Sequence, residues 1–206
     1  MEQRHKSILE LLAREGAVSV RDLRAILKVS PETVRRDISF LAQSQQLKRT
    51  HGGAIAVDSQ EPEIRERLGT NPAEKQAIGR TAASLVPDGA VVILDCGSTV
   101  QAVAHALADK ERLTVITNDL TICGILARRN GNRVHLLGGM IQEHEDATIG
   151  PDAVAMLEQY RADYAFIGAG AITQEPWLMD YSREASALRQ MMLGAARATV
   201  VVADHS

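Results

Sequence analysis

Two neighbouring arginines, Arg35 and Arg36, stand in the run SPETVRRD at residues 30–37. Guanidinium groups bind phosphates and the edges of guanine bases, so an exposed pair is typical of a nucleic-acid contact. Two adjacent arginines are also common on an ordinary solvated surface, and the pair alone leaves that interpretation open. Its meaning depends on the element that carries it.

The same run has the features of a helix start. Ser30 offers a hydroxyl as N-cap, and Pro31 suits the first helical position because its missing N–H would have no partner there. Val34, Ile38 and Leu41 then recur at spacings of four and three, which predicts one buried stripe. We therefore expect a helix whose opposite face presents the two arginines to solvent.

The surrounding residues predict a winged helix-turn-helix in residues 1–57. Residues 2–15 form an amphipathic pattern that stops at a glycine, and Ser19 followed by Asp22 resembles a capping box that opens a second helix. After Leu47, basic residues flank a glycine pair, as expected of a wing that lies along a DNA backbone. The residues expected to contact double-stranded DNA are Ser30, Thr33, Arg35, Arg36, Lys48, Arg49 and His51.

The charge distribution supports this assignment. Residues 1–57 carry ten Lys or Arg against six Asp or Glu, a net charge of +4, whereas residues 58–206 carry thirteen against twenty, a net charge of −7. The whole chain has a net charge of −3 and a pI near 6.1, which hides this asymmetry. Only the first part needs to meet phosphate, so we expect a bipolar molecule.

Composition sets further bounds. The 206 residues are 45% hydrophobic, enough for a small and a medium domain, and no apolar run approaches the ~20 residues of a membrane span. We expect a cytoplasmic protein without a membrane partner, because the chain starts in a charged helix and shows no signal-peptide segment. Cys96 and Cys123 lack a second pair for a zinc site, so we expect buried, reduced thiols.

Residues 58–71 are polar and charged, as in a linker, and their second half is expected to be helical. Asn71 with a glutamate three residues on predicts another cap, after which residues 72–206 alternate strands and helices. This order predicts an α/β domain with a mostly parallel sheet covered by helices on both faces. Continuous apolar runs place the strands at 90–95, 113–117, 133–137, 163–167 and 199–203, each buried on both sides.

Small polar residues follow every one of these strands, where open α/β sheets bind ligands. The turn Gly97-Ser98-Thr99 opens a helix and is expected to seat a phosphate, with Asp95, Asn118 and Asp204 accepting hydrogen bonds from sugar hydroxyls. Each single turn is equally consistent with ordinary turn chemistry. No nucleotide-binding glycine motif is present, so we expect no cofactor.

At this point the chain resembles the DeoR family of bacterial transcriptional repressors. The resemblance rests on residues 30–38, 49–54 and 95–99, on Thr117-Asn118 and Gly138-Gly139, and on residues 203–206. It implies a winged helix-turn-helix joined to a sensor similar to ribose-5-phosphate isomerase, in a homodimer or homotetramer. A small phosphorylated sugar or polyol would relieve repression of a carbohydrate-catabolism operon.

Together, the residues and the resemblance assign one effector site. Its expected members are Asp95, Gly97, Ser98, Thr99, Thr117, Asn118, Gly138, Gly139, Glu184, Arg189 and Asp204.

The chain departs from the family pattern in three places. Val100 stands where the family usually repeats threonine, residues 169–177 differ at the sugar end of the site, and family members usually run on past residues 204–206. We therefore expect a shortened sensor with a weaker effector response.

The alternative function is a sugar-phosphate isomerase-like enzyme with an appended helical domain. Its candidate carboxylates are Asp95, Asp180, Glu184 and Asp204, but none stands in a catalytic motif. An RNA-binding or purely oligomerising protein is a third class, which the expected wing and helix disfavour.

Overall fold

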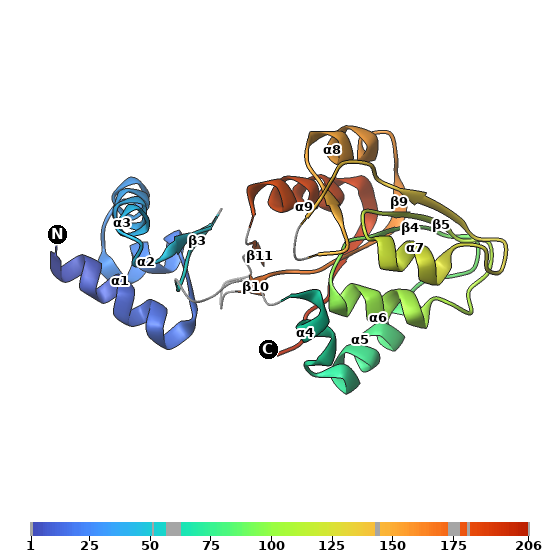
Figure 1. The fold of residues 1–206 in the computed structure, drawn as a ribbon, viewed down its shortest axis with the longest axis horizontal. Coiled ribbons are helices and arrows are strands. Elements are labelled where there is room, and N and C mark those ends of the chain that lie inside the picture. Colours follow the sequence, from blue (N-terminus) through green and yellow to red (C-terminus); the bar gives the residue numbers. More distant parts are fainter. Residues whose placement is uncertain are drawn as a thin grey trace. The chain divides into compact units, whose positions relative to one another are not determined.

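The computed structural model describes residues 2–50, 52–56, 63–142, 145–172, 178–180 and 182–205 (Figure 1). The chain divides into two compact units, Met1–Glu61 with Gly170–Ser186, and Pro62–Ala169 with Ala187–Ser206. The division into 1–57, 58–71 and 72–206 remains a prediction.

The N-terminal unit begins with three helices and three short strands. In chain order these are α1 (Glu2–Glu15), β1 (Ala17–Ser19), α2 (Val20–Leu27), α3 (Pro31–Gln43), β2 (Lys48–Arg49) and β3 (Gly53–Ile55). The strands form an antiparallel sheet in the order β1-β3-β2. This arrangement confirms the winged helix-turn-helix, with the β2–β3 hairpin as the wing.

Local sequence signals set the ends of these helices. Gly16 has φ +72° and its N–H bonds to the carbonyl of Leu12, which closes α1. The Ser19 Oγ accepts a hydrogen bond from the Asp22 N–H at 3.0 Å, as a capping residue does. The Ser30 Oγ caps α3 in the same way from Thr33 at 3.2 Å. Both predicted caps are confirmed.

The core of the N-terminal unit joins all three helices. The predicted stripe of α3 is fully buried, and it packs with residues of α1 and α2 in one cluster: Ile8, Leu12, Leu23, Val34, Ile38 and Leu41. The same burial leaves the other face of α3 in solvent. The helix therefore presents its arginines as the spacing predicts.

Gly53 fixes how closely the wing approaches the rest of the unit. A Cβ at this position would lie 1.9 Å from the carbonyl oxygen of Val18, on the neighbouring strand β1. No side chain fits at that distance. The wing is therefore attached through a backbone contact that only glycine permits.

The second part of the fold is an α/β sheet. Its strands are β4 (Val91–Leu94), β5 (Thr114–Thr117), β6 (Arg133–Leu136), β9 (Ala162–Ile167) and β12 (Ala196–Val201). They pair in parallel in the order β12-β9-β4-β5-β6. All five predicted strands are confirmed, although β12 starts three residues earlier than the prediction.

Six helices accompany the sheet in the part of the chain that the structure describes. They are α4 (Ile64–Gly69), α5 (Pro72–Ser84), α6 (Ser98–Ala106), α7 (Leu120–Leu126), α8 (Pro151–Leu157) and α9 (Arg183–Ala195). The helices α5, α6 and α7 cover one face of the sheet, and α8 and α9 cover the other (Figure 1). The predicted two-layer cover is confirmed.

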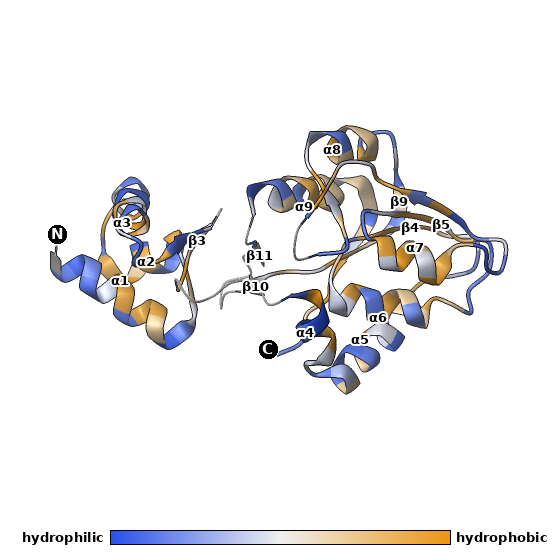
Figure 2. Cartoon of the chain, in the orientation of Figure 1, coloured by the Kyte–Doolittle hydropathy of each residue, from blue (hydrophilic) through white to orange (hydrophobic). Residues whose placement is uncertain are grey.

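The prediction that every strand is buried on both faces is wrong for the edges. The central strands β4 and β5 are buried along nearly their whole length, and most of the α7 ribbon has the colour of hydrophobic residues (Figure 2). The edge strands β6 and β12 are partly exposed. An edge strand has one neighbour, and the covering helices are centred on the middle of the sheet.

Two further expectations need correction, and two short strand pairs are additional. Asn71 does not cap α5 with its side chain, because it adopts a left-handed conformation (φ 48°, ψ 46°) in the tight turn between α4 and α5. Cys96 is buried as predicted, but Cys123 is only half-buried. The sequence analysis did not predict two small antiparallel pairs, because strands of two residues are too short to show a sequence period. These pairs are β7 (Met140–Ile141) with β8 (Thr148–Ile149), and β10 (Ala171–Ile172) with β11 (Leu178–Met179).

The described residues contain no helix that is both long enough and apolar enough to cross a bilayer.

Candidate functional site

The exposed face of α3 carries the predicted arginine pair. Arg35 and Arg36 are both exposed, and the Arg35 Nη1 donates to Glu32 Oε1 at 3.3 Å, with both groups largely in solvent. Such an exposed pair contributes little and breaks readily. Thr33 is half-buried on the first turn beside the Ser30 cap. These residues can meet a polyanion without first losing a strong partner.

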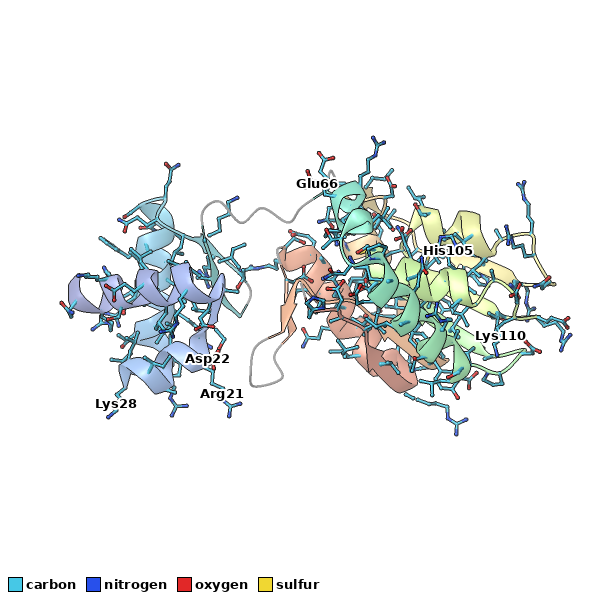
Figure 3. All side chains as sticks on the ribbon, turned by 90° about the horizontal axis from the view of Figure 1, so that it is seen from below. Arg21, Asp22, Lys28, Glu66, His105 and Lys110 are labelled. Carbon is cyan, nitrogen blue, oxygen red and sulfur yellow. The ribbon has the colours of Figure 1, made fainter. Side chains whose placement is uncertain are left out.

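The wing adds further cations next to α3. Arg49 is exposed, and its Nη1 donates to the Ser39 Oγ of α3 at 3.3 Å, while Lys48 is half-buried. His51 lies outside the described residues. Arg21 and Lys28, which the sequence interpretation did not select, project outward from this unit (Figure 3). Arg21 lies in the first turn of α2 and Lys28 directly follows this helix, and these positions could have indicated two exposed cations from the sequence.

A buried carboxylate ties α1 to α3. Asp37 accepts hydrogen bonds from the Nε and Nη2 of Arg4, the second at 2.9 Å, and lies 3.1 Å from His5 Nε2. Its side chain is 4% exposed. The hydrogen bond from Arg4 lowers the pKa of Asp37, and burial opposes that shift. Asp37 follows the arginine pair directly in sequence, and it holds the helix that presents them.

In the sheet unit, the structure joins two of the predicted effector residues directly. Asp95, at the carboxyl end of β4, accepts from Arg189 Nε of α9 at 2.6 Å and from the Gly168 N–H at 3.1 Å. Arg189 Nη2 also lies 3.8 Å from the Cys96 Sγ. Burial raises the pKa of the Cys96 thiol well above its ordinary value, so this thiol is uncharged.

The start of α6 is built to leave backbone N–H groups available. Gly97 has φ +110°, and α6 has no side-chain cap even though Ser98 and Thr99 stand in its first turn. Ser98 is buried and Thr99 is half-buried. A helix N-terminus without a side-chain cap favours anions, although the N–H of Gly97 itself already donates to Asp119 Oδ2 at 3.4 Å.

Asp119 is a buried residue at this edge that the sequence interpretation did not select. Its Oδ2 accepts from Gln101 Nε2 at 3.0 Å and from the Gly97 N–H at 3.4 Å, and its Oδ1 caps α7 through Ile122 at 2.9 Å. Burial raises its pKa, which these hydrogen bonds partly offset. Its position directly after Thr117-Asn118 at a helix start was the signal. It fixes the turns after β4 and β5 relative to each other.

Asn118 and Thr117 have different places in that turn. The Thr117 hydroxyl accepts from the Asp119 N–H at 3.0 Å, so it supports the turn itself. Asn118 is 1% exposed, and its Nδ2 donates to the Thr148 carbonyl at 3.0 Å. Its Oδ1 is buried without a hydrogen-bond partner among the described residues. A buried oxygen without a partner is costly unless something else donates to it.

Two more cations lie at this edge, and the sequence interpretation missed both. Lys75 of α5 forms an ion pair with the predicted residue Asp204 at 3.2 Å, and its Nζ donates to the carbonyls of Arg67 and Thr70 at 2.6 and 2.7 Å. Arg67 of α4 pairs with Glu145. Each partner lies far away in sequence, so spacing carries no signal for these pairs.

The remaining predicted effector residues are placed less centrally. Gly138 and Gly139 are exposed after β6, and Gly139 has φ +142° where a Cβ would lie 2.5 Å from the Ile149 carbonyl oxygen. Glu184 is exposed on the first turn of α9. Their contact with an effector remains a prediction. No three His, Cys, Asp or Glu residues gather as metal ligands within the described ranges.

Comparison with known proteins identifies the family. Residues 4–60 match the "DeoR-like helix-turn-helix domain", and residues 70–206 match the "DeoR C terminal sensor domain". The chain belongs to the DeoR family. The chain is 32% identical over 205 residues to the glycerol-3-phosphate regulon repressor of Escherichia coli, covering 99% of this chain and 81% of that protein. It is 34% identical over 207 residues to the transcriptional repressor GlcR of Bacillus subtilis, covering 100% and 80%.

A solved structure of ribose 5-phosphate isomerase A from Methanocaldococcus jannaschii aligns with a TM-score of 0.47 at 20% identity, over 66% of this chain and 54% of that chain.

The named DeoR-family relatives are repressors, and this chain is likewise a DNA-binding transcriptional regulator. The isomerase-like enzyme considered from the sequence is therefore set aside.

Proposed function

We propose that this DeoR-family protein represses a carbohydrate-catabolism operon and that a small phosphorylated sugar or polyol relieves the repression. The operator is bound by α3 and the wing, and the effector by the carboxyl edge of the sheet. The observation that carries the effector half is the start of α6. There, Gly97 has a left-handed backbone and the first turn lacks a side-chain cap.

A phosphate group fits this place better than a neutral ligand does. The N–H groups at the start of α6 point at one spot, and the helix dipole favours negative charge there. The buried hydroxyl of Ser98 stands in the same turn. We assign the phosphate to the turn at Gly97, Ser98 and Thr99, where the backbone N–H groups and hydroxyls of Ser98 and Thr99 would donate to it and the Gly97 N–H stays with Asp119.

The sugar or polyol end is assigned to the polar residues at the neighbouring strand ends. Asn118 Oδ1 is a buried acceptor that a ligand hydroxyl would satisfy. Asp95 and Asp204 are buried carboxylates that already hold cations, so a hydroxyl would add to their pairs without replacing them. Their contact with the effector is part of the proposal.

On the DNA side, Arg35 and Arg36 are assigned to the groove and Lys48, Arg49 and His51 to the wing contact with phosphates. A helix-turn-helix protein commonly binds two half-sites as a dimer or a pair of dimers. We accordingly propose a homodimer or homotetramer.

A thermal-shift screen of sugar and polyol phosphates tests the effector half. We expect at least one compound at ~100 times its Kd to stabilise the protein by about 2.7 kcal/mol, which shifts Tm by several degrees. Its dephosphorylated counterpart should have no effect, and the same compound should release a promoter fragment in a gel-retardation assay. A screen in which no phosphorylated compound stabilises the protein would contradict the proposal.

A further inference from the structure

The helix α4 connects residues 57–62 to the sheet unit, and it is only six residues long. A helix this short is not stable by itself in water, so its position depends on tertiary contacts. Ile64 is buried at its start, and α4 packs against α6. At its other end, the Lys75 ammonium donates to the carbonyl of Arg67 in α4 and to that of Thr70 directly after the helix. The place of α4 is thus determined by a few specific contacts.

Arg67 is the side chain of α4 that reaches the phosphate site. A Cβ on Gly97 would lie 3.7 Å from the Arg67 Nη1, so the guanidinium lies directly beside the start of α6. The Arg67 side chain is 21% exposed. A phosphate held by the first N–H groups of α6 would be within reach of this guanidinium, whose planar donors suit phosphate oxygens.

Glu145 holds the same guanidinium. Its Oε1 accepts a hydrogen bond from the Arg67 Nη2, and its side chain is only 4% exposed. Burial is the main cause that raises the pKa of Cys96, and the carboxylates of Asp95, Glu145 and Asp119 add to it, while Arg189 opposes it. A phosphate dianion would be repelled by Glu145 and attracted by Arg67. The two anions therefore compete for one cation.

We propose that Arg67 couples the phosphate site to the linker: a bound phosphate group takes the place of Glu145 on Arg67 and clamps α4 to the start of α6. Because α4 is the first helix after the linker in sequence, with Glu63 as its N-cap, the clamp transmits effector binding toward the DNA-binding module. This inference rests on the proposed function and names the regulatory contact within that site.

Isothermal titration of the full chain with inorganic phosphate tests the competition. Glu145→Gln keeps the shape and removes the competing charge, so the Kd for phosphate should fall by about tenfold. Arg67→Gln should raise it by at least tenfold, and Arg67→Lys, which keeps the charge but loses the planar donors, should raise it by about threefold. The last variant decides the question if Arg67→Gln does not fold.

The matched controls are Glu111→Gln and Arg112→Gln, an exposed ion pair at 2.6 Å that precedes β5 and so lies at the opposite, amino edge of the sheet. Both should leave the Kd for phosphate within twofold of wild type.

Hydrogen exchange then tests the clamp. Saturating phosphate should slow amide exchange of residues 64–70 at least fivefold in wild type and in Arg112→Gln. It should not do so in Arg67→Gln, or in Arg67→Lys if Arg67→Gln does not fold.

The outcomes separate the two proposals. If the wild type binds neither inorganic phosphate nor any phosphorylated sugar, the proposed function itself is overturned. Normal phosphate binding with an unchanged Kd in Glu145→Gln, or with unchanged exchange in α4, would overturn the role of Arg67 and leave the phosphate site intact.

Discussion

The two regions of the molecule use their cations in opposite ways. In the DNA-binding module, Arg35 and Arg36 stand exposed, and Arg35 has a weak, solvated partner. In the sheet unit, Arg67, Lys75 and Arg189 are largely enclosed and each is paired with a carboxylate. The exposed face of α3 offers available charge, whereas the carboxyl edge of the sheet holds charge that is already compensated.

This difference matches the two kinds of ligand that we propose. DNA is a continuous polyanion, and exposed cations bind it by releasing its counterions, which requires no rearrangement of the protein. A single phosphate ester must be captured from solution and reported elsewhere. Buried cations that exchange one anion for another bind the ester and change their surroundings in the same step.

The largest expected effect is on operator binding. Arg35→Ala with Arg36→Ala should weaken operator binding by about a hundredfold or more, because each lost arginine contact costs about 1–3 kcal/mol. The slope of log K against log salt should also become shallower by about two units. Fluorescence anisotropy over a salt series measures both quantities.

The adjacent pair Arg128 and Arg129 provides the control, since both are exposed arginines in the sheet unit. Their double alanine variant should bind the operator as wild type does. Equal losses in the two double variants would show that overall charge, not the face of α3, decides binding. That result would remove the distinction between the two regions.

The next largest effect is on the stability of the DNA-binding module, through Asp37, which ties α3 to α1. Asp37→Asn should lower the free energy of unfolding of the DNA-binding module by about 2 kcal/mol, because charge-assisted hydrogen bonds to a buried carboxylate are lost. Urea unfolding of the full chain, followed by far-UV circular dichroism, measures the change. Glu10→Gln is the control, since its pair with Lys6 is exposed and contributes little.

The same variant has a defined pH dependence. Arg4 lowers the folded-state pKa of Asp37, so the ionised carboxylate stabilises the fold above the ordinary pKa of about 4. The difference between wild type and Asp37→Asn should be complete at pH 6 and shrink as the pH falls through the lowered pKa. A difference that stays constant down to pH 3 would exclude the ion pair as its cause.

The smallest expected effect is at the start of α6. Ser98→Ala with Thr99→Ala should weaken binding of a sugar phosphate by about tenfold, because hydroxyl donors to the phosphate are lost while the backbone donors remain. Operator binding without effector should not change. The shift in Tm as a function of ligand concentration measures the loss.

Thr81→Ala with Ser84→Ala is the matching control, since these hydroxyls donate to carbonyls of their own helix α5. A loss of operator binding in the Ser98 and Thr99 variant would contradict the division of labour between the two regions.

The sequence predicted well wherever a property depends on near neighbours. The Ser30 cap and the buried stripe of Val34, Ile38 and Leu41 follow from spacings of three and four residues along one helix. The parallel strands follow from apolar runs and their alternation with helices. The Asn71 cap failed because the turn between α4 and α5 imposes a left-handed backbone there, and that turn depends on how the two helices pack.

The candidate site was predicted as a place, but not as a set of partners. The strand ends located Asp95, Asn118 and Asp204 at one edge of the sheet. The pairing of Arg67 with Glu145 spans 78 residues, and that of Arg189 with Asp95 spans 94. No local pattern specifies which cation meets which carboxylate over such distances, because the crossovers of the fold decide it.

The close backbone contact between Gly53 and Val18 matters for attempts to redirect this protein to new promoters. A library that randomises positions 35, 36, 48 and 49 varies the surface that we propose contacts DNA and keeps the residues that support it. Including position 53 would fill the library with clones whose hairpin is pushed off its neighbour, so that codon is best held constant.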